Sequence, residues 1–402
     1  MPTRALLLAL LALPTLAADL TVSADFPSAS ANVLSLDQST RAIKINPTPH
    51  KDRGWQCWWY FKLAGITPGE TITLDVGGEN AFATPDRAHV STDAGKTWRH
   101  TAPGKKAGKR IVYSIKIDAD SALLAWGPPF TNDDAQSLVD RIAKLIDGKD
   151  GCRAESFNLA NSRENRPVPA LRLTPSRQPE NLKPRGVLVT ARQHAWESGG
   201  SWVGVGLAEF LASDDPAAAA LRKSAHIVFV PIMDVDNVAI GAGGKNQLPH
   251  DHNRDWSDKP VFPPVAACQK IVKDLDAAGQ FDLFVDLHNP APNDKQPFYY
   301  IGAKDLHQPA AKANLQTLVD LSKKHITGPL AFKGLLKDSG PGYDKLWKSI
   351  SGNWVSATCS PHVVATCLET SYNTPDSTID NYKTVGKQLG ATIHAYLAAR
   401  QK

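Results

Sequence analysis

The sequence predicts an α/β fold with a doubly wound, mixed but mainly parallel sheet, preceded by an all-β sandwich domain. Two observations support this prediction. Short apolar and aromatic segments separated by Gly/Pro turns fill the first third of the chain, which is typical of a sandwich. After them, strand-like apolar runs alternate with helical patterns, which favours parallel strands joined by helices. We therefore expect a β domain over residues 19–127 and an α/β domain over residues 128–402.

The composition of the chain indicates its broad structural class. The chain has 402 residues, 42% hydrophobic and 21% charged, with a net charge of +5, as in ordinary soluble globular proteins. The one dense basic cluster, Lys105–Arg110, is interpreted as a solvated turn, so no nucleic-acid partner is expected. Five cysteines are an odd number, which leaves at least one unpaired in a monomer. Cys359 and Cys367 are close enough in sequence to bridge a loop.

The N-terminus has the pattern of a secretory signal peptide. Arg4 precedes the unbroken apolar run Ala5–Pro14, and small residues follow up to Ala18. The run is too short to span a membrane, which takes about 20 residues, and no later segment is apolar enough to do so. We expect residues 1–18 to be a cleaved signal peptide and the protein to be exported, periplasmic or secreted. A buried first helix is the alternative.

In the β domain, strands are expected where apolar and aromatic residues cluster. These segments are Trp55–Leu63, Thr71–Val76, Ala88–Ser91, Arg110–Ile117 and Ala122–Trp126. The stretch Ser91–Trp98 matches the Asp-box pattern of sialidase propellers. A propeller repeats this pattern in every blade, so one copy predicts only a β-hairpin turn.

In the α/β domain, the first helix is expected to begin at the N-cap Thr131 and to run to about Ile146. Later strands are expected at Gly186–Ala191, Ala225–Met233, Leu283–Leu287 and Val363–Leu368. Later helices are expected at Trp202–Ala212, Val265–Ala278 and Val385–Ala399. Active sites of such sheets lie beyond the carboxyl ends of the strands.

Candidate metal ligands stand at two of these strand ends. His194 and Glu197 form an H-x-x-E pattern after one strand, and His288 ends another. Alone, an H-x-x-E pattern is often a chance or surface feature, and a lone His is often a satisfied core residue. Together, two His and one Glu can hold a tetrahedral zinc with one position left for water, as in catalytic sites.

Two further elements suit a hydrolytic site. Asn253 and Arg254 offer amide and guanidinium donors that can grip a carboxylate, although a surface loop with a salt bridge is the simpler alternative. Glu369 directly follows an apolar strand. Beside an activated water it could accept a proton and pass it to the leaving amine; otherwise it is an ordinary exposed Glu.

This order of elements resembles the zinc carboxypeptidases of the carboxypeptidase A family. It is closest to the cytosolic carboxypeptidase subfamily, which carries an N-terminal β-sandwich. The resemblance covers nearly all of the mature chain and is seen in Thr190–Ser198, His252–Trp256, Asp286–His288, Trp58–Phe61 and Ile66–Gly69. It implies one Zn2+ per chain held by His194, Glu197 and His288, with Glu369 as general base, and substrate carboxylate binding by Asn253 and Arg254.

Three departures from the family pattern are visible. The family's N-P-D-G sequence is replaced by Asp234–Asn237, and its oxyanion-stabilising arginine would fall at Gly244. Lys245, the next residue, could substitute for it or be merely solvated. The family's substrate-contacting tyrosine has no secure match; Tyr343 is the first candidate and Tyr372 the second. The export signal argues against a tubulin-tail substrate.

The sequence therefore predicts a zinc metallocarboxypeptidase that removes C-terminal amino acids from peptides or proteins. One alternative is an amide hydrolase of cell-wall peptides that uses the same zinc site. The other is a binding protein that kept the fold after losing the arginine. His250 and His252 could hold a second metal, but satisfied loop histidines are the preferred interpretation.

Overall fold

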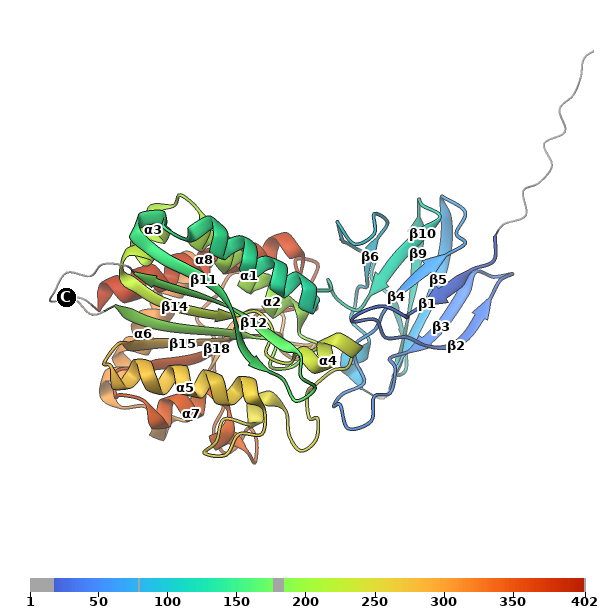
Figure 1. Cartoon of the computed structure of the whole chain (residues 1–402). Helices are drawn as coiled ribbons and strands as arrows, with labels where there is room; N and C mark the ends of the chain where they lie inside the picture. Colours follow the sequence, from blue (N-terminus) through green and yellow to red (C-terminus); the bar gives the residue numbers. More distant parts are fainter. Residues whose placement is uncertain (1–17, 79, 176–183, 401–402) are drawn as a thin grey trace, which may run out of the picture.

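The computed structural model describes residues 18–78, 80–175 and 184–400; the predicted signal peptide therefore lies almost wholly outside the described residues. Figure 1 shows two bodies, an N-terminal β part and a larger α/β part. The predicted fold class is confirmed. No helix in the described part of the chain is long and apolar enough to cross a membrane.

The β part contains two five-stranded sheets. One has the order β1-β4-β10-β6-β7 and the other the order β2-β3-β5-β9-β8. Pairing is antiparallel except between β3 and β5. The strands are β1 Thr21–Ser23, β2 Asn32–Asp37, β3 Ala42–Asn46, β4 Tyr60–Ala64, β5 Glu70–Gly77, β6 His89–Ser91, β7 Arg99–His100, β8 Lys105–Ala107, β9 Arg110–Ile117 and β10 Ser121–Ala125.

The Asp-box stretch forms the predicted hairpin turn between β6 and β7, which pair antiparallel. Asp93 Oδ1 accepts hydrogen bonds from the Ser91 hydroxyl at 2.8 Å and the Thr97 amide at 2.9 Å. The Gly95 amide in turn donates to Ser91 Oγ at 2.9 Å. The motif closes a local turn through its own side chains.

The α/β part is built on an eight-stranded sheet of order β11-β12-β14-β13-β15-β18-β16-β17. Its central strands β14, β13, β15 and β18 run parallel. Antiparallel pairs flank them. The strands are β11 Cys152–Asn161, β12 Pro167–Pro175, β13 Arg185–Ala191, β14 Ala225–Val230, β15 Phe281–His288, β16 Phe298–Ile301, β17 Leu336–Asp338 and β18 Val364–Glu369.

Helices cover both faces of this sheet, with α1, α2 and α8 on one side and α5 and α7 on the other (Figure 1). The helices are α1 Asn132–Ile146, α2 Ser198–Ala212, α3 Pro216–Ser224, α4 Val235–Ile240, α5 Pro263–Ala277, α6 Pro309–His325, α7 Ser351–Thr358 and α8 Ile379–Ala399. All residues of β15 and β18 are buried, which explains why they read as near-continuous apolar runs. The predicted N-cap Thr131 accepts from the Asp134 amide, forming a capping box.

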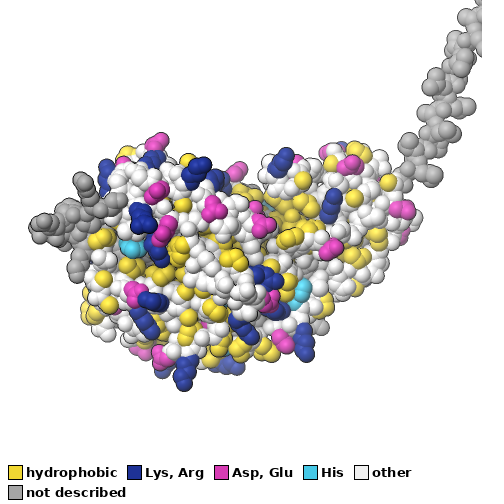
Figure 2. All heavy atoms as spheres, viewed as in Figure 1, with side chains coloured by type: hydrophobic (Ala, Val, Ile, Leu, Met, Phe, Trp, Pro, Cys, Tyr) yellow, Lys and Arg dark blue, Asp and Glu magenta, His cyan; other side chains and the backbone are white. Residues whose placement is uncertain are grey.

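Aromatic residues join the two parts. Trp196 and Tyr372 of the α/β part pack into the hydrophobic core of the β part. The Trp196 ring centroid lies 5.2 Å from that of Trp126 and 5.4 Å from that of Phe82. Figure 2 shows hydrophobic side chains gathered in the hollow between the two bodies. The β part is therefore packed directly against the loop that carries His194 and Glu197.

Candidate metal centre and active site

The carboxyl ends of three neighbouring parallel strands bring the candidate residues together. His194 and Glu197 follow β13, His288 is the last residue of β15, and Glu369 is the last residue of β18. In the strand register His288 stands directly beside Glu369. His288 and Glu369, 81 positions apart along the chain, thus become neighbours at one edge of the sheet.

The loop after β13 is shaped by Arg192, a residue that sequence reasoning missed. Arg192 has a left-handed backbone with φ of 59° and is only 2% exposed. Its Nε donates to the carbonyl oxygen of Ala195 at 2.8 Å, and its Nη1 donates to that of Phe130 at 3.3 Å. These bonds fold the loop back on itself, so that His194 and Glu197 face the same point.

Three side chains form a compact donor set. The Nδ1 atoms of His194 and His288 lie 2.7 Å from Oε1 and Oε2 of Glu197, respectively. All three side chains are buried, and their ligand atoms lie within 4.8 Å of one another. Burial alone would raise the pKa of Glu197, but His194 and His288 outweigh it and lower the pKa to about 2. The carboxyl group is therefore held in the ionised form that a metal requires.

A carboxylate stands behind each imidazole. Asp286 Oδ2 lies 2.9 Å from Nε2 of His288, and Asp251 Oδ1 lies 3.4 Å from Nε2 of His194. Such carboxylates orient metal-ligating histidines and fix their tautomer. Asp286 is itself held by hydroxyl groups of Thr190 and Ser351, at 2.8 and 2.9 Å. Sequence reasoning missed the roles of both Asp residues. The sequence patterns that could have indicated them are D-L-H for Asp286 and D-H-N-R for Asp251.

The residues present fit zinc. Two imidazole nitrogens and one carboxylate are the donors that catalytic zinc sites use, with one position left open. Oε2 of Glu369 is a buried atom without a hydrogen bond to the described residues. Burying such groups unsatisfied is costly, which indicates that the pocket is built around a further group.

A second set of possible ligands overlaps the first. His288, Cys367 and Glu369 also bring donor atoms within 4.8 Å of one another. The Cys367 thiol lies 3.6 Å from Glu369 Oε1, and burial, reinforced by Glu369, raises the pKa of this thiol well above its usual value. The set with His194 and Glu197 is favoured for the metal because its two imidazoles and one carboxylate are the donors of catalytic zinc sites.

Glu369 has the environment of a proton-transfer group. It is only 7% exposed, and burial raises the pKa of its carboxyl to about 8, with His288 opposing the shift. A carboxyl group tuned towards neutral pH is suited to accept and return a proton.

Asn253 and Arg254 lie on a buried turn beside this group. The Asn253 amide oxygen accepts from the Ser351 amide at 3.0 Å, and its Nδ2 lies 3.4 Å from His288 Nε2. Arg254 donates from Nε to Asp344 and from Nη1 to the Asn253 carbonyl oxygen, both at 2.9 Å. Its Nη2 has no partner among the described residues, so Arg254 keeps a donor for a ligand.

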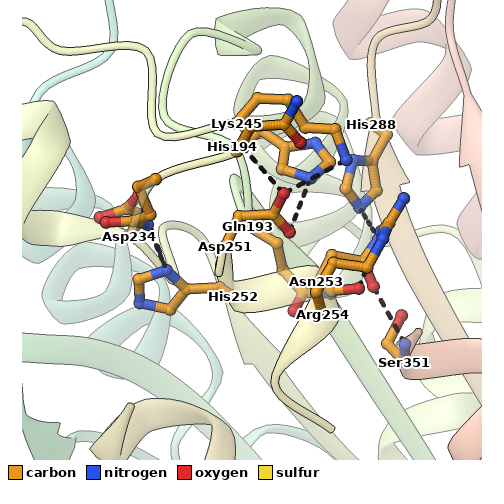
Figure 3. A network of polar contacts seen from close by, with 12 residues as sticks. Gln193, His194, Asp234, Lys245, Asp251, His252, Asn253, Arg254, His288 and Ser351 are labelled. Carbon is orange, nitrogen blue, oxygen red and sulfur yellow. Dashed lines mark hydrogen bonds and ion pairs between the residues drawn. The ribbon is translucent and has the colours of Figure 1, made fainter. Parts of the chain in front are cut away.

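Lys245 points into the same cluster (Figure 3). Its ammonium lies 3.2 Å from Asp251 Oδ2, the carboxylate that backs His194, without the alignment of a hydrogen bond. Gly244 itself has φ of +79°, and a side chain there would overlap the Asp234 carboxylate and the backbone of Ala195. The position where the resemblance predicts the family arginine is thus closed to a side chain, and Lys245 is the cation that this loop supplies.

The remaining candidates are placed as follows. Tyr343 is 45% exposed, and its ring lies 4.8 Å from that of Tyr300 and 5.6 Å from the guanidinium of Arg254. It therefore stands at the rim of the site. Tyr372 lies in the aromatic cluster between the two parts, with its ring 4.5 Å from that of Trp126.

The two loop histidines have partners within the chain. His250 Nε2 lies 2.6 Å from Asp255, while His252 lies 3.2 Å from Gln247 and stacks on Phe262 at 3.9 Å. Neither belongs to a possible metal-binding group in the described part of the chain. The five cysteines are all unpaired, so Cys359 and Cys367 form no disulfide.

The fold and the donor set define a metallohydrolase of the α/β class. Comparison with known proteins makes this specific: a profile of the zinc carboxypeptidase family matches residues 142–384. The chain belongs to this family.

Relatives agree with this assignment. Cytosolic carboxypeptidase 2 of Xenopus tropicalis is 26% identical over 245 residues, which cover 59% of this chain and 25% of the relative. The Danio rerio protein of the same name is 29% identical over 258 residues, covering 58% and 35%. The matched region is thus about a quarter to a third of the length of these relatives.

Solved structures share the fold over almost the whole chain. A metallo-carboxypeptidase from Burkholderia cenocepacia has a TM-score of 0.78 at 20% identity, covering 95% of this chain and 100% of its own. A metallo-carboxypeptidase from Pseudomonas aeruginosa has a TM-score of 0.77 at 22% identity, with the same coverage. The β part is therefore included in the shared architecture.

Proposed function

We propose that this protein is a zinc carboxypeptidase that hydrolyses the C-terminal peptide bond of peptides or proteins. The observation that carries the proposal is the meeting of three kinds of group at one buried sheet edge. These are the donor set of His194, Glu197 and His288, the carboxyl of Glu369 with its free Oε2, and the Arg254 guanidinium with its free Nη2. The zinc carboxypeptidase family supports the assignment.

Each group has a defined role in this proposal. One zinc ion, when bound by His194, Glu197 and His288, would polarise the scissile carbonyl and activate water. Glu369 accepts the proton of the attacking water and returns it to the leaving amine. A bound substrate is oriented by Arg254, whose planar guanidinium matches a carboxylate.

Three residues complete the proposed site. Lys245 places a positive charge where negative charge develops on the carbonyl oxygen, the task of the missing arginine. Asn253 holds its amide beside His288 and the Arg254 turn, where it can support the substrate carboxylate. Tyr343, at the rim, contacts the bound residue.

We further propose that the substrate is met outside the cytoplasm, because the first 18 residues have the signal-peptide pattern. The alternative substrates, cell-wall peptides, can be distinguished by experiment, because their termini differ in configuration from those of proteins.

The test is release of the C-terminal residue from matched peptides with free, amidated and D-configured termini. Purified mature protein and Glu369→Gln would be compared at equal zinc content. We expect cleavage of free L termini only, with a loss of about 10²- to 10⁴-fold in the variant. Preferential cleavage of D-configured termini would favour the cell-wall alternative. Zinc binding without any cleavage would favour the binding protein.

A further inference from the structure

The loop that carries Lys245 is bound along its length by a loop of the β part. The Trp55 amide donates to the Lys245 carbonyl oxygen at 2.9 Å, and the Gly244 amide donates to the Arg53 carbonyl oxygen at 2.9 Å. The Leu248 amide donates to the Asp52 carbonyl oxygen at 3.0 Å. These bonds join residues about 190 positions apart, and all are backbone bonds that no side-chain pattern reveals.

The other side of the same loop is bonded to the metal-site loop. The Trp196 amide, next to Glu197, donates to the Gly243 carbonyl oxygen at 3.1 Å. The Lys245 loop is thus held between the β part and the loop that supplies His194 and Glu197. Its position in space is set by both.

Two glycines make this close approach possible. Gly54 has φ of +83°, and a side chain there would overlap the Lys245 carbonyl oxygen. A side chain on Gly243 would overlap the Trp55 carbonyl oxygen. Only glycine leaves room for the two backbones at these points.

The β-part loop is itself fixed to the α/β part from outside. Arg53 forms an ion pair with Glu164, in the turn between β11 and β12, and Glu164 also pairs with Arg166. Arg166 lies 2.9 Å from Asp236 of α4. The Arg53 side chain therefore anchors the loop to the α/β part, in addition to the backbone bonds to the Lys245 segment.

From these contacts we infer that the β-part loop Asp52–Trp55 is a positioning element of the active site, which fixes the Lys245 ammonium in its place. This inference rests on the proposed role of Lys245 in stabilising negative charge. Lys245 has a flexible four-carbon stem and, among the residues that the structure describes, one ion pair, with Asp251, so its backbone must be fixed for its charge to be preorganised. The β part thereby completes the catalytic site in addition to packing against it.

A double-mutant cycle tests the inference. Gly54→Ala, Lys245→Ala and the double variant would be compared for kcat, KM and zinc content. Gly69→Ala is the matched control, because Gly69 lies in the β part with φ of +91° and has no atom near its absent side chain. We expect Gly54→Ala to lower kcat about 10- to 100-fold with zinc content unchanged, the size of effect that a displaced catalytic group produces. Gly69→Ala should leave kcat unchanged.

The decisive result is the dependence on Lys245. In the Lys245→Ala background, Gly54→Ala should lower kcat no further. An equal loss in both backgrounds would overturn the inference, because it would indicate a general structural defect. Loss of kcat in Lys245→Ala with none in Gly54→Ala would overturn the inference and leave the role of Lys245 intact. Full kcat in Lys245→Ala would overturn both.

A milder variant covers the case in which Gly54→Ala does not fold. Arg53→Gln removes the outer ion pair with Glu164 and leaves the backbone bonds possible. We expect a several-fold loss of kcat in the presence of Lys245 and none in its absence. The same loss in both backgrounds, or no loss in either, would overturn the inference.

Discussion

Asp286 Oδ2 lies 2.9 Å from Nε2 of His288, on the side of the imidazole opposite Glu197. The ring is thereby held between two carboxylates, one that shares the metal site and one that faces the protein interior. This arrangement fixes the tautomer that leaves Nδ1 free to bind a cation.

Asp286→Asn should therefore weaken zinc binding by about 10- to 100-fold, because an amide orients the ring less strongly and reduces its basicity. The measurement is a competition titration against a chromophoric zinc chelator. Asp282→Asn is the control: Asp282 is on the same strand and equally buried, but it pairs with Arg185 and Arg400. The account is contradicted if both variants bind zinc as tightly as the original chain.

Arg254→Gln should raise KM for peptides with a free C-terminus by about 10- to 100-fold, because a charge-assisted hydrogen bond of about 1.5–3 kcal/mol is lost. Steady-state kinetics on a short peptide would measure it. Arg254→Lys should recover only part of the loss, since an ammonium cannot reproduce the fork geometry. An unchanged KM in Arg254→Gln would show that the carboxylate is bound elsewhere.

We expect His89, in the β6–β7 hairpin, to make the stability of the protein depend on pH. Burial, and then the neighbouring His100 ring at 4.4 Å, lowers the pKa of His89 well below its ordinary value of 6.5. Below pH 6.5 His89 becomes protonated in the unfolded chain but stays neutral in the folded chain. As the pH falls, the free energy of unfolding therefore decreases by up to about 1.4 kcal/mol per pH unit. Neutral pH keeps this stability in full.

Chemical unfolding at pH 7.5, 6.5 and 5.5 measures the effect. The difference between the original chain and His89→Gln isolates the contribution of His89 from those of other groups. The original chain should lose more stability than the variant between pH 6.5 and 5.5. Parallel pH profiles would argue against a neutral buried His89.

The free cysteines give a simple chemical prediction. Denatured, unreduced protein should show five reactive thiols, because all five cysteines are unpaired. Four of them are buried in the folded chain, and Cys359 is partly exposed, so Cys359 should react first with a thiol reagent. A count of three after denaturation would reveal a disulfide.

Much of the fold could be predicted because its central strands are buried on both faces. The predicted strands Gly186–Ala191, Leu283–Leu287 and Val363–Leu368 became β13, β15 and β18, and each leads directly to a proposed site residue. Continuous apolar runs identify such strands without knowledge of their partners. The ligands were visible for the same reason, since they end or follow these runs.

The hairpin of β11 and β12 was not predicted. Pro167, Pro169 and Pro175 weaken the strand signal of β12, because proline cannot donate to a ladder. Its place is set by pairing with β11 on one side and β14 on the other. Tertiary contact overrides local preference here.

The residues that support the proposed metal ligands could not be predicted from the sequence either. From the sequence, Asp251 is only one polar residue of a loop. In the structure it lies between His194 and Lys245. The position of Lys245 depends on backbone bonds to Arg53 and Trp55, which have no side-chain signature. The domain boundaries and the signal peptide remain predictions from sequence.

The central claim is that His194, Glu197 and His288 hold one zinc ion. The most direct measurement is anomalous X-ray scattering on either side of the zinc absorption edge, from crystals of the mature protein grown with equimolar zinc. The account predicts one peak, bonded to Nδ1 of both histidines and to the Glu197 carboxylate. A peak bonded to Cys367 and Glu369 instead, or no peak at the sheet edge, would contradict it.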